Sequence, residues 1–176
     1  MERFARNTAA CQRPVGPPRT FTPPCYDRHM RFSGEHRFSA PRAIVFATLF
    51  DPAAIKAALP GCDLVRRDGD SYTVELLANV AGLRGSYRGT ASVQMVRREA
   101  SWRLAVRGAG TPGTVEGEAT IELHDDGDGT RLVYDGDARA SGAIARQGAT
   151  ALSGAGRLLI SGFLRGMEKQ VALRVP

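Results

Sequence analysis

Cys62 is the residue whose type and setting first suggest chemistry in this sequence, because it stands directly behind Pro60 and Gly61. A cysteine acts as a thiolate nucleophile, as a metal ligand or as half of a disulfide. The other cysteines are Cys11 and Cys25, so their number is odd, and no CxxC spacing occurs. A disulfide framework or a zinc site is therefore not expected. We interpret Cys62 as a small buried residue at a helix-to-strand turn, with a reactive thiol as the alternative.

His36 is the histidine that shares a predicted strand face with apolar residues, Phe32 and Phe38. A histidine works as a general base when a serine, a cysteine or a carboxylate lies in reach of its ring. The sequence shows no such partner in a clear phase with His36. We interpret it as a structural or ligand-contacting residue, with a catalytic base as the alternative, and we assign no catalytic residue.

Other motifs resemble chemical sites but fail in context. Residues 108–113, GAGTPG, fit the letters of a dinucleotide-binding loop, yet a strand pattern follows instead of the helix that would hold the pyrophosphate. Glu116, Glu118 and Glu122 fall on the polar phase of a strand. Residues 125–129, DDGDG, form a turn that lacks the later glutamate of a calcium loop. No metal site and no cofactor are expected.

Aromatic residues on the inward phase of the predicted strands are better placed to form a site, because each joins an apolar ring to a polar tip. We expect them to line a pocket for an apolar small molecule, with tyrosine hydroxyl groups orienting the polar end of that molecule. The predicted lining consists of Tyr72, Tyr87, Trp102, Tyr134, Leu152, Leu159, Phe163 and His36.

Hydrophobic periodicity predicts the elements that position these residues. Residues 31–38 alternate like a half-buried strand, and residues 39–59 fit two short helices, capped at Ser39 and Asp51. About six further strands then alternate, as in an antiparallel sheet with one solvated face. Residues 142 to about 173 form one long amphipathic helix, whose apolar stripe must pack on the sheet. The predicted fold class is therefore α+β.

Small residues are frequent at positions where bulky ones are expected. The inward phase of the strands carries Gly85, Gly89, Ala91, Gly117, Ala119, Gly136 and Ala138, and the long helix has glycine at 148, 154, 156, 162 and 166. They fit two interpretations equally. One is a close approach of the helix, with bulges that curve the sheet, and the other is an apolar cavity between sheet and helix.

The net charge is +6, but half of it lies in the first 29 residues, which hold five arginines and two acids. The other charges are interspersed and no basic, aromatic-rich strand is present, so nucleic-acid binding is not expected. The same 29 residues are rich in proline and non-periodic, which predicts a disordered extension before a single domain over residues 30–176. No apolar run approaches about 18 residues. We expect a cytoplasmic protein with at most peripheral membrane contact.

A family resemblance is carried by residues 30–65, MRFSGEHRFSAPRAIVFATLFDPAAIKAALPGCDLV, which join two helix starts to LPGC. With GLRGSYRGTASV at 82–93 and GTRLVYDGDARASGAIARQG at 129–148, this segment resembles the CoxG-like family, named after the CoxG protein of carbon monoxide dehydrogenase. That family lies in the START/Bet v 1-like (SRPBCC) helix-grip superfamily. The resemblance extends to about residue 171 and implies a curved antiparallel sheet of about seven strands, wrapped around a long C-terminal helix over a hydrophobic cavity.

Members of that family are associated with aerobic carbon monoxide dehydrogenases and related molybdenum hydroxylases, in maturation, membrane recruitment or handling of a lipophilic quinone. The resemblance implies a non-catalytic accessory protein that binds a hydrophobic, lipid-like or quinone-like small molecule and has a molybdenum hydroxylase as partner. The alternative is an enzyme of the polyketide cyclase or lyase kind that uses the same cavity. His36 stands where the family more often has an apolar residue, and the C-terminal tail with which some members bind membranes is not seen before Pro176.

Overall fold

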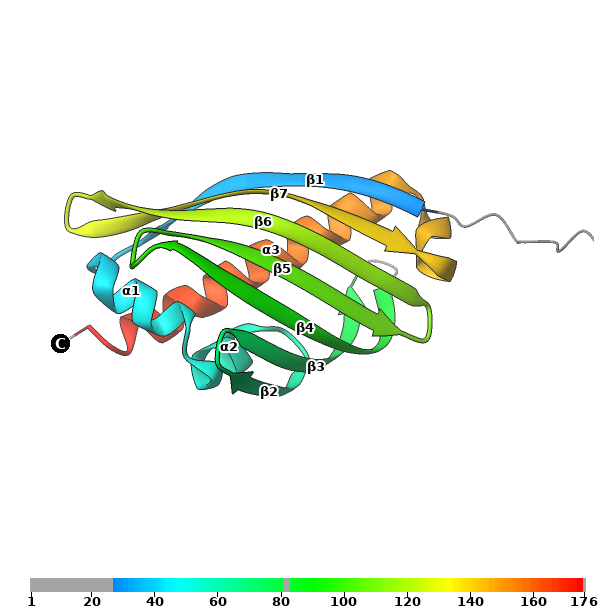
Figure 1. Ribbon diagram of the computed structural model, residues 1–176, viewed down its shortest axis with the longest axis horizontal. Helices are drawn as coiled ribbons and strands as arrows, with labels where there is room; N and C mark the ends of the chain where they lie inside the picture. The colour runs from blue at the N-terminus through cyan, green and yellow to red at the C-terminus, as the bar shows by residue number, and fades with distance from the viewer. Residues whose placement is uncertain (1–26, 81–82, 176) are drawn as a thin grey trace, which may run out of the picture.

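The computed structural model describes residues 27–80 and 83–175. Seven strands form one antiparallel sheet in the order β1-β7-β6-β5-β4-β3-β2, and the helix α3 lies along one face of it (Figure 1). The elements are β1 (Asp27–Phe38), α1 (Arg42–Leu49), α2 (Pro52–Ala58), β2 (Cys62–Asp68), β3 (Ser71–Val80), β4 (Leu83–Arg97), β5 (Ser101–Gly110), β6 (Gly113–Asp126), β7 (Gly129–Ser141), a 3₁₀ helix η1 (Gly142–Gln147) and α3 (Ala149–Ala172). The predicted α+β helix-grip fold is confirmed.

β1 begins earlier than the sequence pattern indicates. It pairs with β7 from Asp27, opposite Ser141, to Phe38, opposite Thr130. Residues 27–29 therefore belong to the sheet, although the predicted extension includes them. The rest of that extension, with Cys11 and Cys25, lies outside the described residues.

The two short helices are confirmed, but only one of their predicted caps is. Asp51 caps α2, because its Oδ1 accepts a hydrogen bond of 2.9 Å from the backbone N–H of Ala53. At α1 the N-cap position is Pro41, which makes no side-chain cap. Ser39 precedes this position by two residues, too early in the chain to cap the first turn, so the cap predicted there is wrong.

The predicted long helix is interrupted at Gly148. Residues 142–147 form the 3₁₀ helix η1, and α3 begins only after Gly148, whose φ of +87° is a left-handed value that favours glycine. The backbone carbonyl of Gly148 accepts the first bond of α3, from Leu152 N. Ile144 before the break and Leu152 after it still pack into one apolar cluster. The apolar periodicity therefore continues through a break in the helix.

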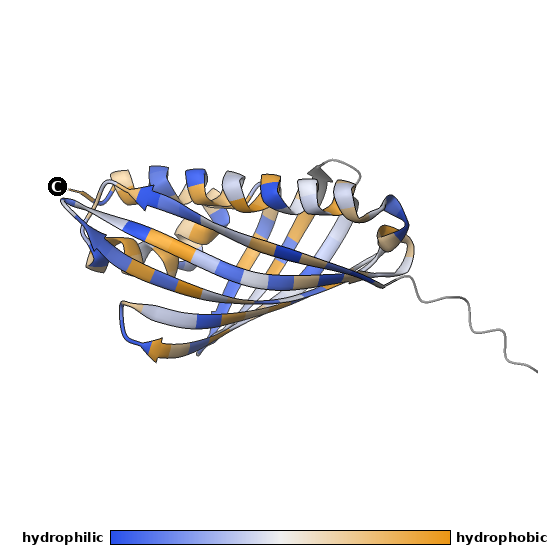
Figure 2. Ribbon diagram, turned by 90° about the horizontal axis from the view of Figure 1, so that it is seen from above, coloured by the Kyte–Doolittle hydropathy of each residue, from blue (hydrophilic) through white to orange (hydrophobic). Residues whose placement is uncertain are grey.

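Two apolar clusters between the sheet and the helices hold α3, one near each end of it. Figure 2 shows apolar and polar residues alternating along α3 and the strands. The α1 cluster, at the C-terminal end of α3, includes Phe38, Val45, Trp102, Ile121, Leu123, Leu132, Leu164, Met167 and Val171. The η1 cluster, at the N-terminal end, includes Met30, Tyr87, Ala140, Ile144 and Leu152. Each large side chain that is fully buried contributes about 1.5–3 kcal/mol to stability.

Candidate functional site

Small residues meet on the inner face of the sheet, between the two clusters. The strand register places Gly89 opposite Gly108, Gly117 opposite Ala138, and Ala119 opposite Gly136. With Ala91, which faces Val106, they form a patch across β4 to β7 that we call the small-residue floor: Gly89, Ala91, Gly108, Gly117, Ala119, Gly136 and Ala138. All seven are half-buried, so the inner face is not sealed by the helix here.

Open space lies above one point of this floor. A Cβ added to Gly108 would meet a single atom within 4 Å, the Val115 carbonyl oxygen at 3.9 Å. Val106, two residues earlier on the same face, keeps 38% of its surface exposed. The small size of Gly108 therefore does not serve a close approach of α3, because no atom of α3 lies within 4 Å of a Cβ placed there. The cavity interpretation fits this position.

Two of the helix glycines, by contrast, do serve close approach, whereas a Cβ on Gly154 would meet nothing within 4 Å. A Cβ on Gly156 would lie 2.6 Å from the Phe32 ring, and one on Gly166 would lie 2.5 Å from the backbone oxygen of Ala58 in α2. Accordingly α3 packs most closely against α2 and β1, at the borders of the sheet rather than over its middle strands. Close approach therefore explains Gly156 and Gly166, and an apolar cavity above the small-residue floor stays a prediction.

A cleft opens between α1 and the inner face of β3 and β4, with a volume of about 550 Å³. Its apolar wall is formed by Phe46, Phe50, Tyr72, Val93 and Met95, and its charged rim by Asp51, Arg67, Asp70, Arg98, Glu99 and Arg174. Tyr72 faces Ala91 of the small-residue floor across the β3–β4 pair. The cleft therefore adjoins the floor along the same face of the sheet.

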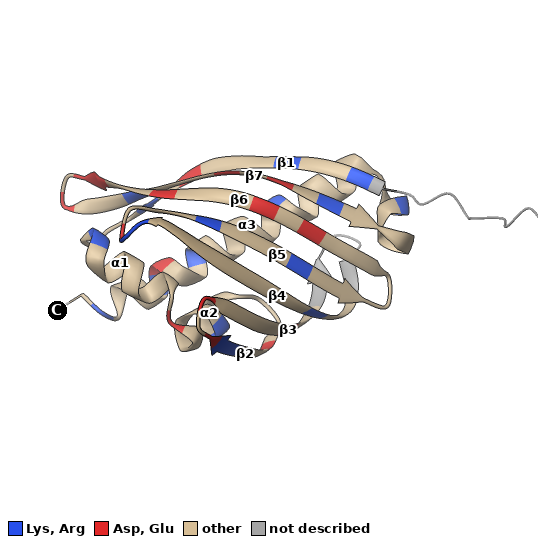
Figure 3. Cartoon of the chain, in the orientation of Figure 1, with Lys and Arg blue, Asp and Glu red and all other residues tan. Residues whose placement is uncertain are grey.

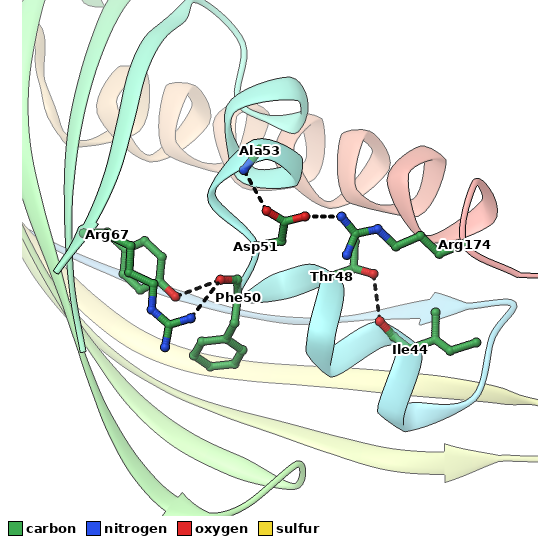
Figure 4. Close-up of polar contacts among 8 residues, drawn as sticks. Ile44, Thr48, Phe50, Asp51, Ala53, Arg67 and Arg174 are labelled. Atoms are coloured by element: carbon green, nitrogen blue, oxygen red, sulfur yellow. Dashed lines mark hydrogen bonds and ion pairs between the residues drawn. The ribbon is translucent and has the colours of Figure 1, made fainter. Parts of the chain in front are cut away.

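Polar contacts fix the rim of this cleft (Figure 4). The Tyr72 hydroxyl donates to the Phe50 carbonyl at 3.0 Å, and the Arg67 guanidinium donates to the same oxygen at 3.4 Å. Arg174 donates to Asp51, which lowers the pKa of that carboxyl below its ordinary value. Burial raises the pKa of Tyr72. The end of α1 is thus held from the sheet and from the C-terminal segment.

The predicted lining residues divide between several places instead of surrounding one point. Trp102 stands edge-on to Phe46 and Phe50, with ring centroids 6.0 and 5.1 Å away. The other members lie as follows: Tyr72 in the cleft; Tyr87 and Leu152 in the η1 cluster; Tyr134 and Phe163 against the α1 cluster; Leu159 half-buried on α3; His36 on β1 beside α3.

His36 has a carboxylate partner that the sequence pattern does not reveal. Its Nε2 lies 3.4 Å from Glu168 Oε2, and its ring stands edge-on to Phe38 at 4.8 Å between centroids. The fold thus brings to His36 a carboxylate that is not in phase with it along the sequence. The available signal is that Glu168 is the only acidic residue from 142 to 176, in a segment with several basic ones.

Charge is distributed differently over the sheet and over α3 (Figure 3). Ion pairs join strands on the outer face, among them Arg31–Asp135, Arg88–Glu75, Arg107–Glu116 and Arg131–Glu35. The outward side of η1 and α3 carries exposed Arg146, Arg157, Arg165 and Lys169, none of which makes an ion pair within the described residues. We call these four residues the basic face of α3.

Residues 27–80 and 83–175 contain no group of three or more His, Cys, Asp or Glu side chains arranged to hold a metal ion. Within the same ranges, no helix combines the length and hydropathy needed to cross a bilayer.

An antiparallel sheet that wraps around a single long helix defines the helix-grip class, and solved structures share this fold. A conserved protein from Geobacillus kaustophilus is 28% identical with a TM-score of 0.78, over 82% of this chain and 96% of that one. The Zhui aromatase/cyclase from Streptomyces sp. R1128 is 15% identical with a TM-score of 0.64, over 85% and 97% of the two chains. A START superfamily protein from Mycobacterium smegmatis is 13% identical with a TM-score of 0.64, over 84% and 100%.

The family itself is shown by sequence. The carbon monoxide dehydrogenase CoxG family matches residues 34–172, and the chain belongs to that family. A comparison with curated proteins found no match.

Proposed function

We propose that this protein is a non-catalytic carrier of a lipophilic small molecule, which it holds between α3 and the small-residue floor. The observation that carries the proposal is the half-buried apolar floor with open space above Gly108. The cleft beneath α1 serves as the mouth, because Tyr72 in its wall adjoins the floor. Burial of about 300 Å² of apolar ligand surface contributes about 7 kcal/mol at about 25 cal/mol per Å². Part of this offsets the freedom that the ligand loses on binding.

The absence of polar side chains from the floor favours a carrier over the alternative, a cyclase-like or lyase-like enzyme. General acid–base catalysis needs polar groups that converge on the reacting atoms. The floor consists of glycine and alanine, and the buried Nε2 of His36 lies 3.4 Å from Glu168 Oε2 and makes no hydrogen bond within the described residues. The fold shared with an aromatase/cyclase at 15% identity adds no support for such chemistry here.

Membership of the CoxG family supports an accessory role beside a carbon monoxide dehydrogenase-type molybdenum hydroxylase. Such a role needs a surface for the partner, and the unpaired basic face of α3 matches an acidic one. Binding of a purified carbon monoxide dehydrogenase holoenzyme is then expected to weaken as salt rises and in an Arg157→Glu, Arg165→Glu variant. Reversal of Arg103, an exposed residue of β5, is the matched control. If both variants bind the holoenzyme equally well, the contact with the partner lies on a surface other than the basic face of α3.

Native mass spectrometry of the protein, purified without added ligand, tests the carrier role. A carrier retains a lipophilic molecule, seen as an additional mass that organic extraction removes. The extracted protein is then titrated with N-phenyl-1-naphthylamine, whose fluorescence rises in an apolar site. If the purified protein retains no additional mass and the fluorescence does not rise on titration, the protein is a filled scaffold and the proposal is refuted.

A further inference from the structure

Tyr87 has a buried hydroxyl group without a hydrogen-bond partner. The side chain is 8% exposed, and its oxygen makes no hydrogen bond within the described residues and has almost no contact with solvent. It lies in the η1 cluster, among Met30, Ala140, Ile144 and Leu152. Burial is also the cause that raises the pKa of this phenol. Buried polar groups of native proteins are nearly always paired, so an exception requires an explanation.

Other buried hydroxyl groups of the same protein are satisfied. Tyr72 donates to the Phe50 carbonyl at 3.0 Å, and Thr130 donates to the Ala40 carbonyl at 2.8 Å. The fold therefore supplies partners to buried hydroxyl groups elsewhere. The Tyr87 hydroxyl differs in having none from the protein.

Tyr87 stands at the end of the small-residue floor. It precedes Gly89 by two residues on the same face of β4, and it lies opposite Gly110, as Gly89 lies opposite Gly108. Its ring leans over Gly110, because a Cβ there would lie 2.8 Å from the Tyr87 Cδ1 atom. The open space above Gly108 is therefore two residue pairs along the ladder from this ring, at the next pair on the same face.

We propose that the Tyr87 hydroxyl is the hydrogen-bond donor that recognises an acceptor oxygen, of the carbonyl class, on an otherwise apolar ligand. This inference rests on the carrier function proposed above and adds the ligand's chemistry and orientation: its oxygen-bearing end lies toward η1. A phenol is a stronger donor than acceptor, since its oxygen lone pairs are delocalised into the ring, and this favours an acceptor on the ligand. A ligand oxygen would accept the hydrogen bond for which the protein itself offers no partner. The free energy of that hydrogen bond would then contribute to the affinity for the ligand.

Two probes of the same shape test this assignment. 2-Acetylnaphthalene carries a carbonyl oxygen where 2-isopropenylnaphthalene carries a CH₂ group. Equilibrium dialysis gives the dissociation constants of both probes for the ligand-free wild type and for Tyr87→Phe. We expect the preference for the ketone to fall about tenfold in the variant, which equals about 1.4 kcal/mol. Comparing ratios cancels the different hydration of the two probes.

Thr130→Val is the matched control, since it also removes a buried hydroxyl but away from the floor. It should keep the wild-type preference and lower the melting temperature. Without ligand, Tyr87→Phe should melt at or above the wild-type temperature, because it removes an unpaired group.

An unchanged preference in Tyr87→Phe, with both probes still bound, would overturn the assignment of Tyr87 and leave the carrier function standing. A melting temperature lowered as far as in Thr130→Val would also overturn it, since the hydroxyl would then have a partner within the protein. If neither probe binds the wild type, the carrier function fails together with this inference.

Discussion

Glu168 of α3 lies beside His36 of β1, with 3.4 Å between Oε2 and Nε2 and no hydrogen bond between them. The His36 side chain is 20% exposed and that of Glu168 46%, so water reaches the carboxylate but hardly the ring. The contact joins the long helix to the first strand beside the α1 cluster. A histidine and a carboxylate can act together in catalysis, but this pair has the position of a structural contact between two elements.

Replacing His36 with Phe therefore distinguishes a structural contact between α3 and β1 from a catalytic base. The phenyl ring keeps the edge contact with Phe38, and Glu168 is exposed enough to be hydrated without its partner. We expect the stability to change by about 1 kcal/mol or less, as for a partly exposed polar contact on the surface of a helix. Affinity for N-phenyl-1-naphthylamine should stay within about twofold, and Glu168→Gln should behave alike. If the wild type turns over a cyclisable polyketide and His36→Phe does not, the carrier function is wrong.

Filling the space above Gly108 should block binding without unfolding the protein. Gly108→Leu adds a side chain where a Cβ meets only one atom within 4 Å, and leucine suits a strand better than glycine. We expect an unchanged or higher melting temperature and at least about tenfold weaker binding of N-phenyl-1-naphthylamine.

Gly136→Leu provides the contrast, because its Cβ would lie 2.6 Å from the Cβ of Ala119. Overpacking there is expected to cost about 1–3 kcal/mol in the free energy of unfolding. Full binding by Gly108→Leu would show that the ligand does not occupy the floor.

The order of elements could be predicted because strands and helices leave different periods in the apolar residues. The break at Gly148 could not, since one left-handed residue changes the backbone and leaves the apolar spacing of Ile144 and Leu152 intact. The pairing of His36 with Glu168 depends on how α3 is placed against β1, which no local pattern contains. For the same reason the predicted lining residues have the right phase but do not meet at one point.

Asp51 should make stability depend on pH in the acid range. It caps α2 and accepts from Arg174, which lowers its pKa in the folded state. A lowered folded pKa means that the stabilisation is fully present above about pH 4, the unfolded value, and is lost as the pH falls through the folded pKa. Asp51→Asn keeps an oxygen that can cap α2 but loses the charge that pairs with Arg174, so it should cost at most about 1 kcal/mol at neutral pH and flatten the acid limb of the melting curve.

Asp68→Asn is the control for this experiment, because Asp68 is exposed and makes no hydrogen bond or ion pair through its side chain in the described part of the chain. The melting temperatures of the wild type, Asp51→Asn and Asp68→Asn are compared between pH 3 and 7. This range of about four units includes the ordinary pKa of aspartate. An Asp51→Asn curve parallel to that of the wild type would show that Arg174 does not stabilise the carboxylate.

Cys62 should be slow to react in the folded protein. The thiol is half-buried and donates to the Leu64 carbonyl at 3.4 Å, and burial raises its pKa. Because the thiolate is the nucleophile, a raised pKa and restricted access both slow alkylation. In a Cys11→Ser, Cys25→Ser background, iodoacetamide at neutral pH should label the native protein at least about tenfold more slowly than the urea-unfolded chain. A native rate equal to or above the unfolded rate would identify an activated thiol, and Cys62 would then be a nucleophile at the start of β2 rather than a buried residue of a turn.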